Sequence, residues 1–167
     1  MIEIEFSNQQ STHSVDAAKL MDAARRILES EGVRRASISI AVVDGPTIRQ
    51  LNRRFLDHDY PTDTLSFVLE RDAEHLEGET IVCADVAASA APRFGWSADD
   101  ELLLYLIHAT LHLVGYDDGD EQSRAAMQAR ERFYLAHYQL APQDDREPAD
   151  VALLDTPRDP AQGGKTS

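Results

Sequence analysis

The stretch SADDELLLYLIHATLHLVGYDD, residues 97–118, decides the fold of this chain. Ser97 and the acids that follow it are typical of a helix start, because their oxygens accept hydrogen bonds from backbone amides that the first turn leaves free. An apolar run follows, and Gly115 can take the left-handed conformation that ends a helix. These signals predict a long apolar helix from Ser97 through Val114.

Two histidines within this helix indicate a metal site. His108 and His112 are four residues apart, so both project from one face of the helix. Gly115 then reverses the chain, and Asp118 can turn its carboxylate back toward the two imidazoles. Three ligands with an open fourth position are what a catalytic metal needs, and this ligand set suits zinc and also iron, manganese or nickel. We therefore predict one bound divalent ion, with zinc expected.

The same residues allow a plainer interpretation. A histidine pair on an apolar helix is often a pair of ordinary core or surface residues, and the acids after Gly115 could form only a solvated turn and the cap of the next helix. A metallopeptidase is disfavoured in either case. Peptidases with the pattern H-E-x-x-H carry their general base directly after the first histidine, where this chain has Ala109.

The segments around this helix alternate between strand and helix patterns. The predicted strands are 1–6, 37–43, 64–69 and 80–83, and the predicted helices are 14–31, 44–55, 85–91, 97–114 and 119–138. The expected fold is α+β: a mixed sheet of about four strands packed with about five helices, with the metal site at a helix end. Residues 1–140 are expected to form one domain, and residues 141–167, which are acidic and rich in proline, a disordered tail.

Composition limits the classes of protein to which the chain can belong. Cys83 is the single cysteine, so no intramolecular disulfide can form, which suits the cytosol. The N-terminus lacks a signal-peptide pattern, and the longest apolar run, Leu102–Ile107, is too short to span a bilayer. We expect a cytoplasmic protein without a membrane partner. The formal net charge of -14 opposes long-range attraction to nucleic acid, so RNA binding would have to rest on a local basic patch or on a metal.

Three blocks of the sequence carry a resemblance to a known family. Residues 108–118 read HATLHLVGYDD, residues 51–67 read LNRRFLDHDYPTDTLSF, and residues 78–82 read GETIV. These blocks resemble H-G-x-L-H-L-x-G-Y-D-H, L-N-x-x-[YF]-R-x-x-D-x-P-T-D-V-L-S-F and G-D-I-x-I of the YbeY family, bacterial endoribonucleases and rRNA maturation factors. Glu101, Met127 and Glu131 also stand where that family has them.

The resemblance implies an α+β fold, a zinc-type site at His108, His112 and Asp118, and a metal-dependent endoribonuclease activity that is specific for single-stranded RNA. It also implies a role in the 3′-end maturation of 16S (small-subunit) rRNA and in ribosome quality control. The implied partners are rRNA, the small ribosomal subunit, a ribosomal protein and an assembly GTPase.

Two positions depart from the family pattern. Asp118 replaces the third histidine, and its carboxylate would lower the net charge of a divalent site from about +2 to about +1. Leu56 stands where the family has an arginine that is thought to help cleavage. Arg53 and Arg54 are candidate replacements, although the sequence favours an ordinary solvated basic face for them. These departures leave two alternatives open: a non-catalytic, metal-binding ribosome-assembly factor, and another kind of metallohydrolase.

Overall fold

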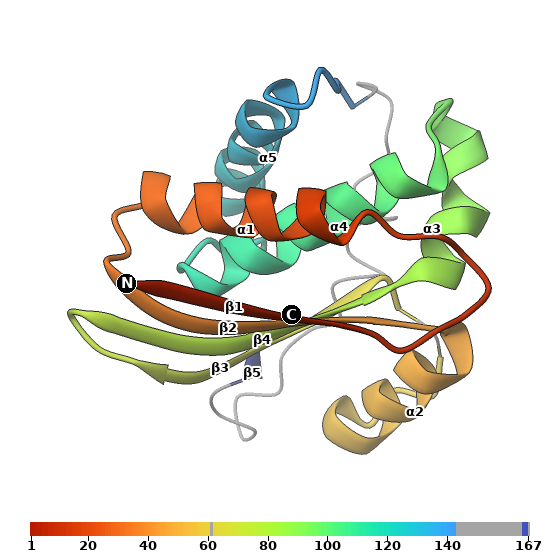
Figure 1. The fold of residues 1–167 in the computed structure, drawn as a ribbon, viewed down its shortest axis with the longest axis horizontal. Coiled ribbons are helices and arrows are strands. Elements are labelled where there is room, and N and C mark those ends of the chain that lie inside the picture. Colours follow the sequence, from red (N-terminus) through yellow and green to blue (C-terminus); the bar gives the residue numbers. More distant parts are fainter. Residues whose placement is uncertain (61, 143–164, 167) are drawn as a thin grey trace.

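The structure is a computed structural model and describes residues 1–60, 62–142 and 165–166. It confirms the predicted α+β fold, a mixed sheet with helices on both faces (Figure 1). The four long strands are β1 (Ile2–Asn8), β2 (Arg35–Val43), β3 (Thr64–Arg71) and β4 (His75–Cys83), and β5 (Lys165–Thr166) adds two residues beside β3.

The sheet has the strand order β1-β2-β4-β3-β5. β1, β2 and β4 run parallel to one another, whereas β3 is antiparallel to both β4 and β5. In β2, the alternating residues Ile38, Ile40 and Val42 are buried, as expected for a strand that turns one face toward the main core.

The helices cover the two faces of the sheet unequally. α1 (Ala17–Ser30) and α4 (Ala98–Leu113) lie on one face with α5 (Glu121–Ala136) packed against α4, and α2 (Gly45–Leu56) lies on the other face (Figure 1). The short helix α3 (Ala84–Ala90) and the 3₁₀ turn η1 (Ala91–Phe94) connect the sheet to α4. The larger core therefore lies under α1 and α4, and a smaller one lies under α2.

α4 is the central helix and begins as predicted. The Ser97 side chain accepts a hydrogen bond from the Asp100 amide, and the Asp100 carboxylate accepts one from the Ser97 amide, which forms a capping box. Every residue from 101 to 113 is buried. Functional side chains on this helix are therefore held by packing on all sides.

Three contacts fix the C-terminal half of α4 on the sheet. The Ser66 hydroxyl donates to the Ala109 carbonyl at 3.1 Å, and the Arg71 guanidinium donates to the Leu113 carbonyl. The Leu113 side chain packs against Gly78 of β4, where an added Cβ would lie 2.9 Å from the leucine Cδ2. These contacts set how far α4 can slide or rotate over β3 and β4.

Most boundaries lie within two residues of the predicted ones, and two differ by three residues or more. β4 begins at His75 rather than at Thr80, because pairing with β2 on one side and β3 on the other outweighs the weak strand tendency of Gly78 and the acids around it. α1 begins later than predicted, directly after Asp16, whose side chain caps the first turn.

Among the described residues, no helix combines the length and the apolar character that crossing a bilayer requires. The predicted disordered tail, residues 141–167, lies almost wholly outside the described part of the chain. Both the disorder of this tail and the domain boundary in front of it therefore stay predictions.

Candidate metal centre

α4 directs two imidazoles to the same point. His108 and His112 lie one turn apart on the buried helix, and their Nε2 atoms are 3.2 Å from each other. Their rings stand almost perpendicular, with an interplanar angle of 84°. Both side chains are nearly inaccessible to solvent, so they form the inner wall of the site.

The turn after α4 brings Asp118 to the two imidazoles. Gly115 has a φ of 110°, and its amide donates to the His112 carbonyl, so the chain reverses here as predicted. One carboxylate oxygen of Asp118, Oδ2, then lies 3.9 Å from the Nε2 of His108 and 4.0 Å from that of His112. The side chain of Asp118 is 17% exposed, which makes it the open side of the site.

Hydrogen bonds to the far side of each ring determine which nitrogen faces the site. Glu131 of α5 lies 2.6 Å from the Nδ1 of His108, and the Tyr116 carbonyl lies 3.1 Å from the Nδ1 of His112. A carbonyl and a carboxylate accept hydrogen bonds, so each Nδ1 carries the proton and donates it. Both Nε2 atoms therefore present lone pairs toward each other and toward Asp118.

This arrangement fits a divalent metal ion. Two lone pairs and a carboxylate oxygen that converge without a proton between them repel one another, and a cation at their centre removes that repulsion. A circle through the three atoms has a radius of about 2.2 Å, close to the zinc–nitrogen and zinc–oxygen bond lengths of about 2.0–2.2 Å. The three ligand atoms all lie within 4.8 Å of one another. The structure thus brings together the three side chains that the sequence predicts as ligands.

A hydrogen-bonded network braces the turn that carries Asp118. The Tyr116 hydroxyl donates to Glu31 at 3.0 Å, and Arg130 and the Tyr134 hydroxyl of α5 donate to the same carboxylate. Burial alone would raise the pKa of the Glu31 carboxyl, but these hydrogen bonds outweigh it and hold the pKa below its ordinary value. Glu31 therefore ties the end of α1 to the Asp118 turn and to α5.

Arg124 lies close to the backbone of the turn that carries Asp118. It lies in the first turn of α5, is partly exposed, and its Nη2 is 3.5 Å from the backbone carbonyl oxygen of Asp118. The guanidinium is thus held beside the backbone of Asp118.

Comparison with known proteins assigns the chain to a family. The family described as Endoribonuclease YbeY matches residues 5–139. The chain belongs to the YbeY family. A relative of that name from Chlorobaculum parvum is 43% identical over 122 residues, which cover 73% of this chain and 86% of the relative. Another from Salinibacter ruber is 34% identical over 140 residues, which cover 79% and 89%. A solution structure from Thermotoga maritima has a TM-score of 0.55 and 25% identity, and the match covers 89% of this chain and 98% of that one.

Leu56, at the position of the arginine in the YbeY pattern, belongs to the core in this member. The residue is 5% exposed and packs between α2 and the sheet in a cluster that includes Leu65 and Phe67. The arginine's charge is therefore absent at this position, and the surroundings of Leu56 are apolar.

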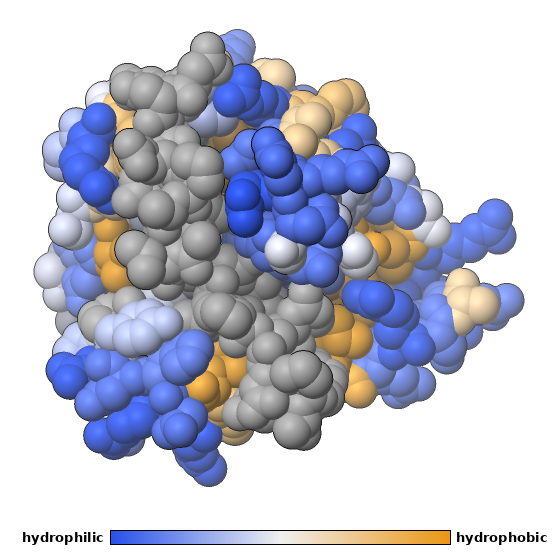
Figure 2. Space-filling view, turned by 180° about the vertical axis from the view of Figure 1, so that it is seen from behind, coloured by the Kyte–Doolittle hydropathy of each residue, from blue (hydrophilic) through white to orange (hydrophobic). Residues whose placement is uncertain are grey.

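The two candidate replacements for that arginine lie on the exposed side of α2. Arg53 lines a surface hollow together with Arg49 and Asp59, and Arg54 lies 5.3 Å from the centre of the Phe55 ring. α2 covers the face of the sheet opposite to α4, and its outer surface is part of the hydrophilic cluster at the lower left of Figure 2. The roles of Arg53 and Arg54 stay predictions, whereas the guanidinium of Arg124 lies beside the backbone carbonyl of Asp118.

The residues that orient the ligands were not predicted as part of the site. Glu131 follows the buried Met127 by one helical turn and precedes the buried Leu135 by another, so a strictly inward-facing acid could have been recognised on the predicted last helix. Such an acid needs a partner, and a ligand histidine is a natural one. No comparable signal exists for Glu31 or Arg124, whose roles depend on how separate elements pack.

Proposed function

We propose that this protein is a metal-dependent endoribonuclease that cleaves single-stranded RNA. The observation that carries the proposal is the centre formed by His108, His112 and Asp118, with an open side, in a chain of the YbeY family. The relatives that match it are named as endoribonucleases, and we transfer that activity to this chain here.

The chain's own residues would hold one divalent ion, with zinc the ion we propose. Glu131 and the Tyr116 carbonyl fix the two imidazoles with their Nε2 lone pairs toward the ion, and the Asp118 turn supplies the third ligand. When bound, such an ion polarises a phosphoryl oxygen and acidifies water at its open position. Ala109 is buried and offers no general base after His108, so proton transfer has to involve a group other than residue 109.

Arg124 would bind the negatively charged phosphodiester at the open side of the site. Asp118 makes the centre less positive than three histidines would, and Leu56 contributes no charge. A guanidinium held 3.5 Å from the Asp118 carbonyl is placed to compensate for both changes. We therefore assign transition-state charge stabilisation to Arg124 rather than to the α2 arginines.

The cellular role that we propose is the maturation of the 3′ end of 16S rRNA and ribosome quality control in the cytoplasm. The partners would be the small ribosomal subunit, one of its proteins and an assembly GTPase. Family membership supports this role, and finding the protein away from small-subunit particles in a fractionated lysate would count against it.

The test of the activity is a gel assay of the purified full chain on single-stranded and double-stranded RNA, with and without a chelator. We expect cleavage of the single strand that stops on chelation, returns with added zinc and is abolished in Asp118→Ala. Cleavage that survives both metal removal and Asp118→Ala would refute the proposal. A panel of small phosphoesters and peptides measured alongside would detect a different metallohydrolase.

A second candidate function is a non-catalytic assembly factor that keeps the metal for structure. The apolar surroundings of Leu56, at the position of the family arginine, favour it. This candidate predicts co-sedimentation with small ribosomal subunits but no cleavage at any zinc concentration. Metal-dependent turnover of RNA would exclude it.

A further inference from the structure

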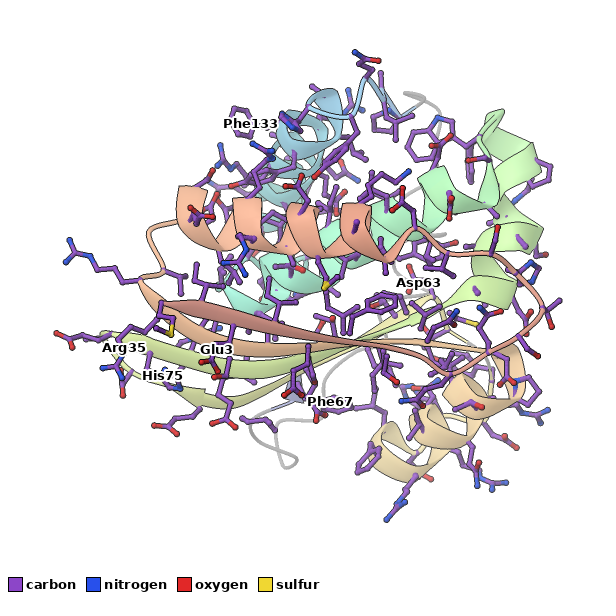
Figure 3. All side chains as sticks on the ribbon, viewed as in Figure 1. Glu3, Arg35, Asp63, Phe67, His75 and Phe133 are labelled. Atoms are coloured by element: carbon purple, nitrogen blue, oxygen red, sulfur yellow. The ribbon has the colours of Figure 1, made fainter. Side chains whose placement is uncertain are left out.

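A hollow at one end of the sheet gathers positive charge in this otherwise acidic protein. It has a volume of about 620 Å³ and lies between the starts of β2 and β4, the end of β3 and the last turn of α4. Its cationic residues are Arg34, Arg35, Arg71 and, when protonated, His75, and we call it the basic hollow. Arg35 and His75 are register partners on adjacent strands and lie together at the end of the sheet (Figure 3).

The arginines of the basic hollow form no ion pair with an acid in the described part of the chain. Elsewhere in the chain, Arg26, Arg49 and Arg130 each form an ion pair with an acid. Within the described residues, none of the three guanidinium groups in the hollow does so. Arg34 and Arg35 are exposed, and Arg71 donates to the Leu113 carbonyl.

Two acids, Asp72 and Glu74, also line the hollow and offset part of its charge. The Asp72 carboxylate accepts hydrogen bonds from the Glu74 and His75 amides, both at 2.8 Å, and so belongs to the turn between β3 and β4. Glu74 is exposed to solvent. Three arginines against two acids leave a positive excess, and the side chains of Arg34 and Arg35 are exposed to solvent. The hollow therefore holds donors that an anion can use.

The hollow adjoins the helix that carries the metal ligands. Leu113 and Val114 line it, and they directly follow His112 in the chain. A helix is about 10 Å across, so a group in the hollow lies on the order of 10 Å from the ligands. This distance corresponds to roughly three nucleotides of a stacked strand, because successive nucleotides are about 3.4 Å apart. One RNA strand can therefore reach both places.

We propose that the basic hollow binds backbone phosphate of single-stranded RNA that flanks the phosphodiester held at the metal centre. Guanidinium groups match the oxygens of a phosphate, and an acidic protein needs such a local patch to approach RNA at all. The inference rests on the proposed endoribonuclease function and names the part of the surface that recognises its substrate.

The test measures binding without cleavage. A fluorescent single-stranded oligouridine is titrated with the full-length protein in the presence of a chelator, and anisotropy gives the Kd at several salt concentrations. We expect Arg35→Ala and the double variant Arg34→Ala/Arg35→Ala to bind about tenfold more weakly or worse, with a salt slope lowered by about 0.7 for each phosphate that the protein no longer neutralises. Arg25→Ala, which removes an exposed arginine from α1, is the matched control and should bind like the wild type.

The outcomes separate this inference from the proposed function. Wild-type cleavage of RNA together with unchanged binding by the hollow variants overturns the inference alone. Binding that depends on the hollow without cleavage in zinc supports the inference and overturns the proposed function. Equal weakening in Arg25→Ala overturns the inference, because binding would then follow total charge. Binding of an acidic peptide but not of oligouridine at the hollow also overturns it.

Discussion

Removing the carboxylate behind His108 should weaken metal binding without unfolding the protein. Glu131 lies 2.6 Å from the Nδ1 of His108, and the two side chains are 9% and 5% exposed, so water cannot replace the bond. Partners of this kind are typically worth about 10- to 100-fold in metal affinity, or about 1.4–2.7 kcal/mol. Glu131→Gln keeps an acceptor but loses the charge and should fall near the lower figure. Glu131→Ala removes both and should fall near the higher one.

The assay is an equilibrium competition for zinc between the protein and a chromophoric chelator at neutral pH. Glu29→Ala, which removes an exposed glutamate from α1, is the control and should bind zinc like the wild type. Circular dichroism of the metal-free variants would establish that they remain folded. The reasoning is refuted if both Glu131 variants bind zinc within twofold of the wild type, because the bond at Nδ1 would then not determine the ligand.

Three further predictions concern the hydrogen bonds of Glu31, the packing of α4 against Gly78 and the charge of Arg124. The pKa of Glu31 is lower in the folded protein than its unfolded value of 4.5, so the ionised carboxylate stabilises the fold. This contribution is complete above pH 4.5 and is lost as the pH falls through the folded pKa. In denaturant unfolding at a series of pH values, Glu31→Gln should therefore be less stable than the wild type at pH 7 and should lose less stability on acidification. Gly78→Ala should lower the free energy of unfolding, measured with denaturant, by about 1–3 kcal/mol. The added Cβ would lie 2.9 Å from Leu113 Cδ2 and 3.0 Å from the Phe67 carbonyl oxygen, so unchanged stability would contradict this packing. Arg124→Ala should lower the rate of RNA cleavage by up to about 100-fold while the bound metal stays the same, and an unchanged kcat would exclude the role assigned to it.

The sequence predicts those parts of the fold that depend on neighbouring residues, such as helix caps, apolar runs and turn glycines. The helix from Ser97 is marked by its cap, its apolar run and Gly115, so its limits and the positions of its two histidines follow from the sequence. The early start of β4 could not be predicted, because Gly78 and its acidic neighbours have little strand tendency of their own. Pairing on both sides and packing against Leu113 determine that segment.

The same distinction holds for the candidate site. Spacing places His108 and His112 on one face, and a turn glycine brings Asp118 back to them. Glu131 and Arg124 come from a helix whose packing against α4 is a tertiary contact, so local patterns do not specify their distances to the ligands.

The basic hollow depends on tertiary structure to an even greater degree. Arg35 and Arg71 are far apart in the sequence and lie on strands that do not pair with each other. They meet because β4 is inserted between β2 and β3. A local basic patch could be anticipated as a requirement for RNA binding, but its location could not.

The central claim is that His108, His112 and Asp118 hold a metal ion, and elemental analysis of the purified protein tests it most directly. We predict about one equivalent of divalent metal per chain in the wild type and in Glu29→Ala, whose exposed carboxylate lies on α1 and is not one of the three ligands. After dialysis against a weak chelator, Asp118→Ala should have lost most of its metal. Equal metal content in the wild type and Asp118→Ala would contradict the claim, because the third ligand would then not be Asp118.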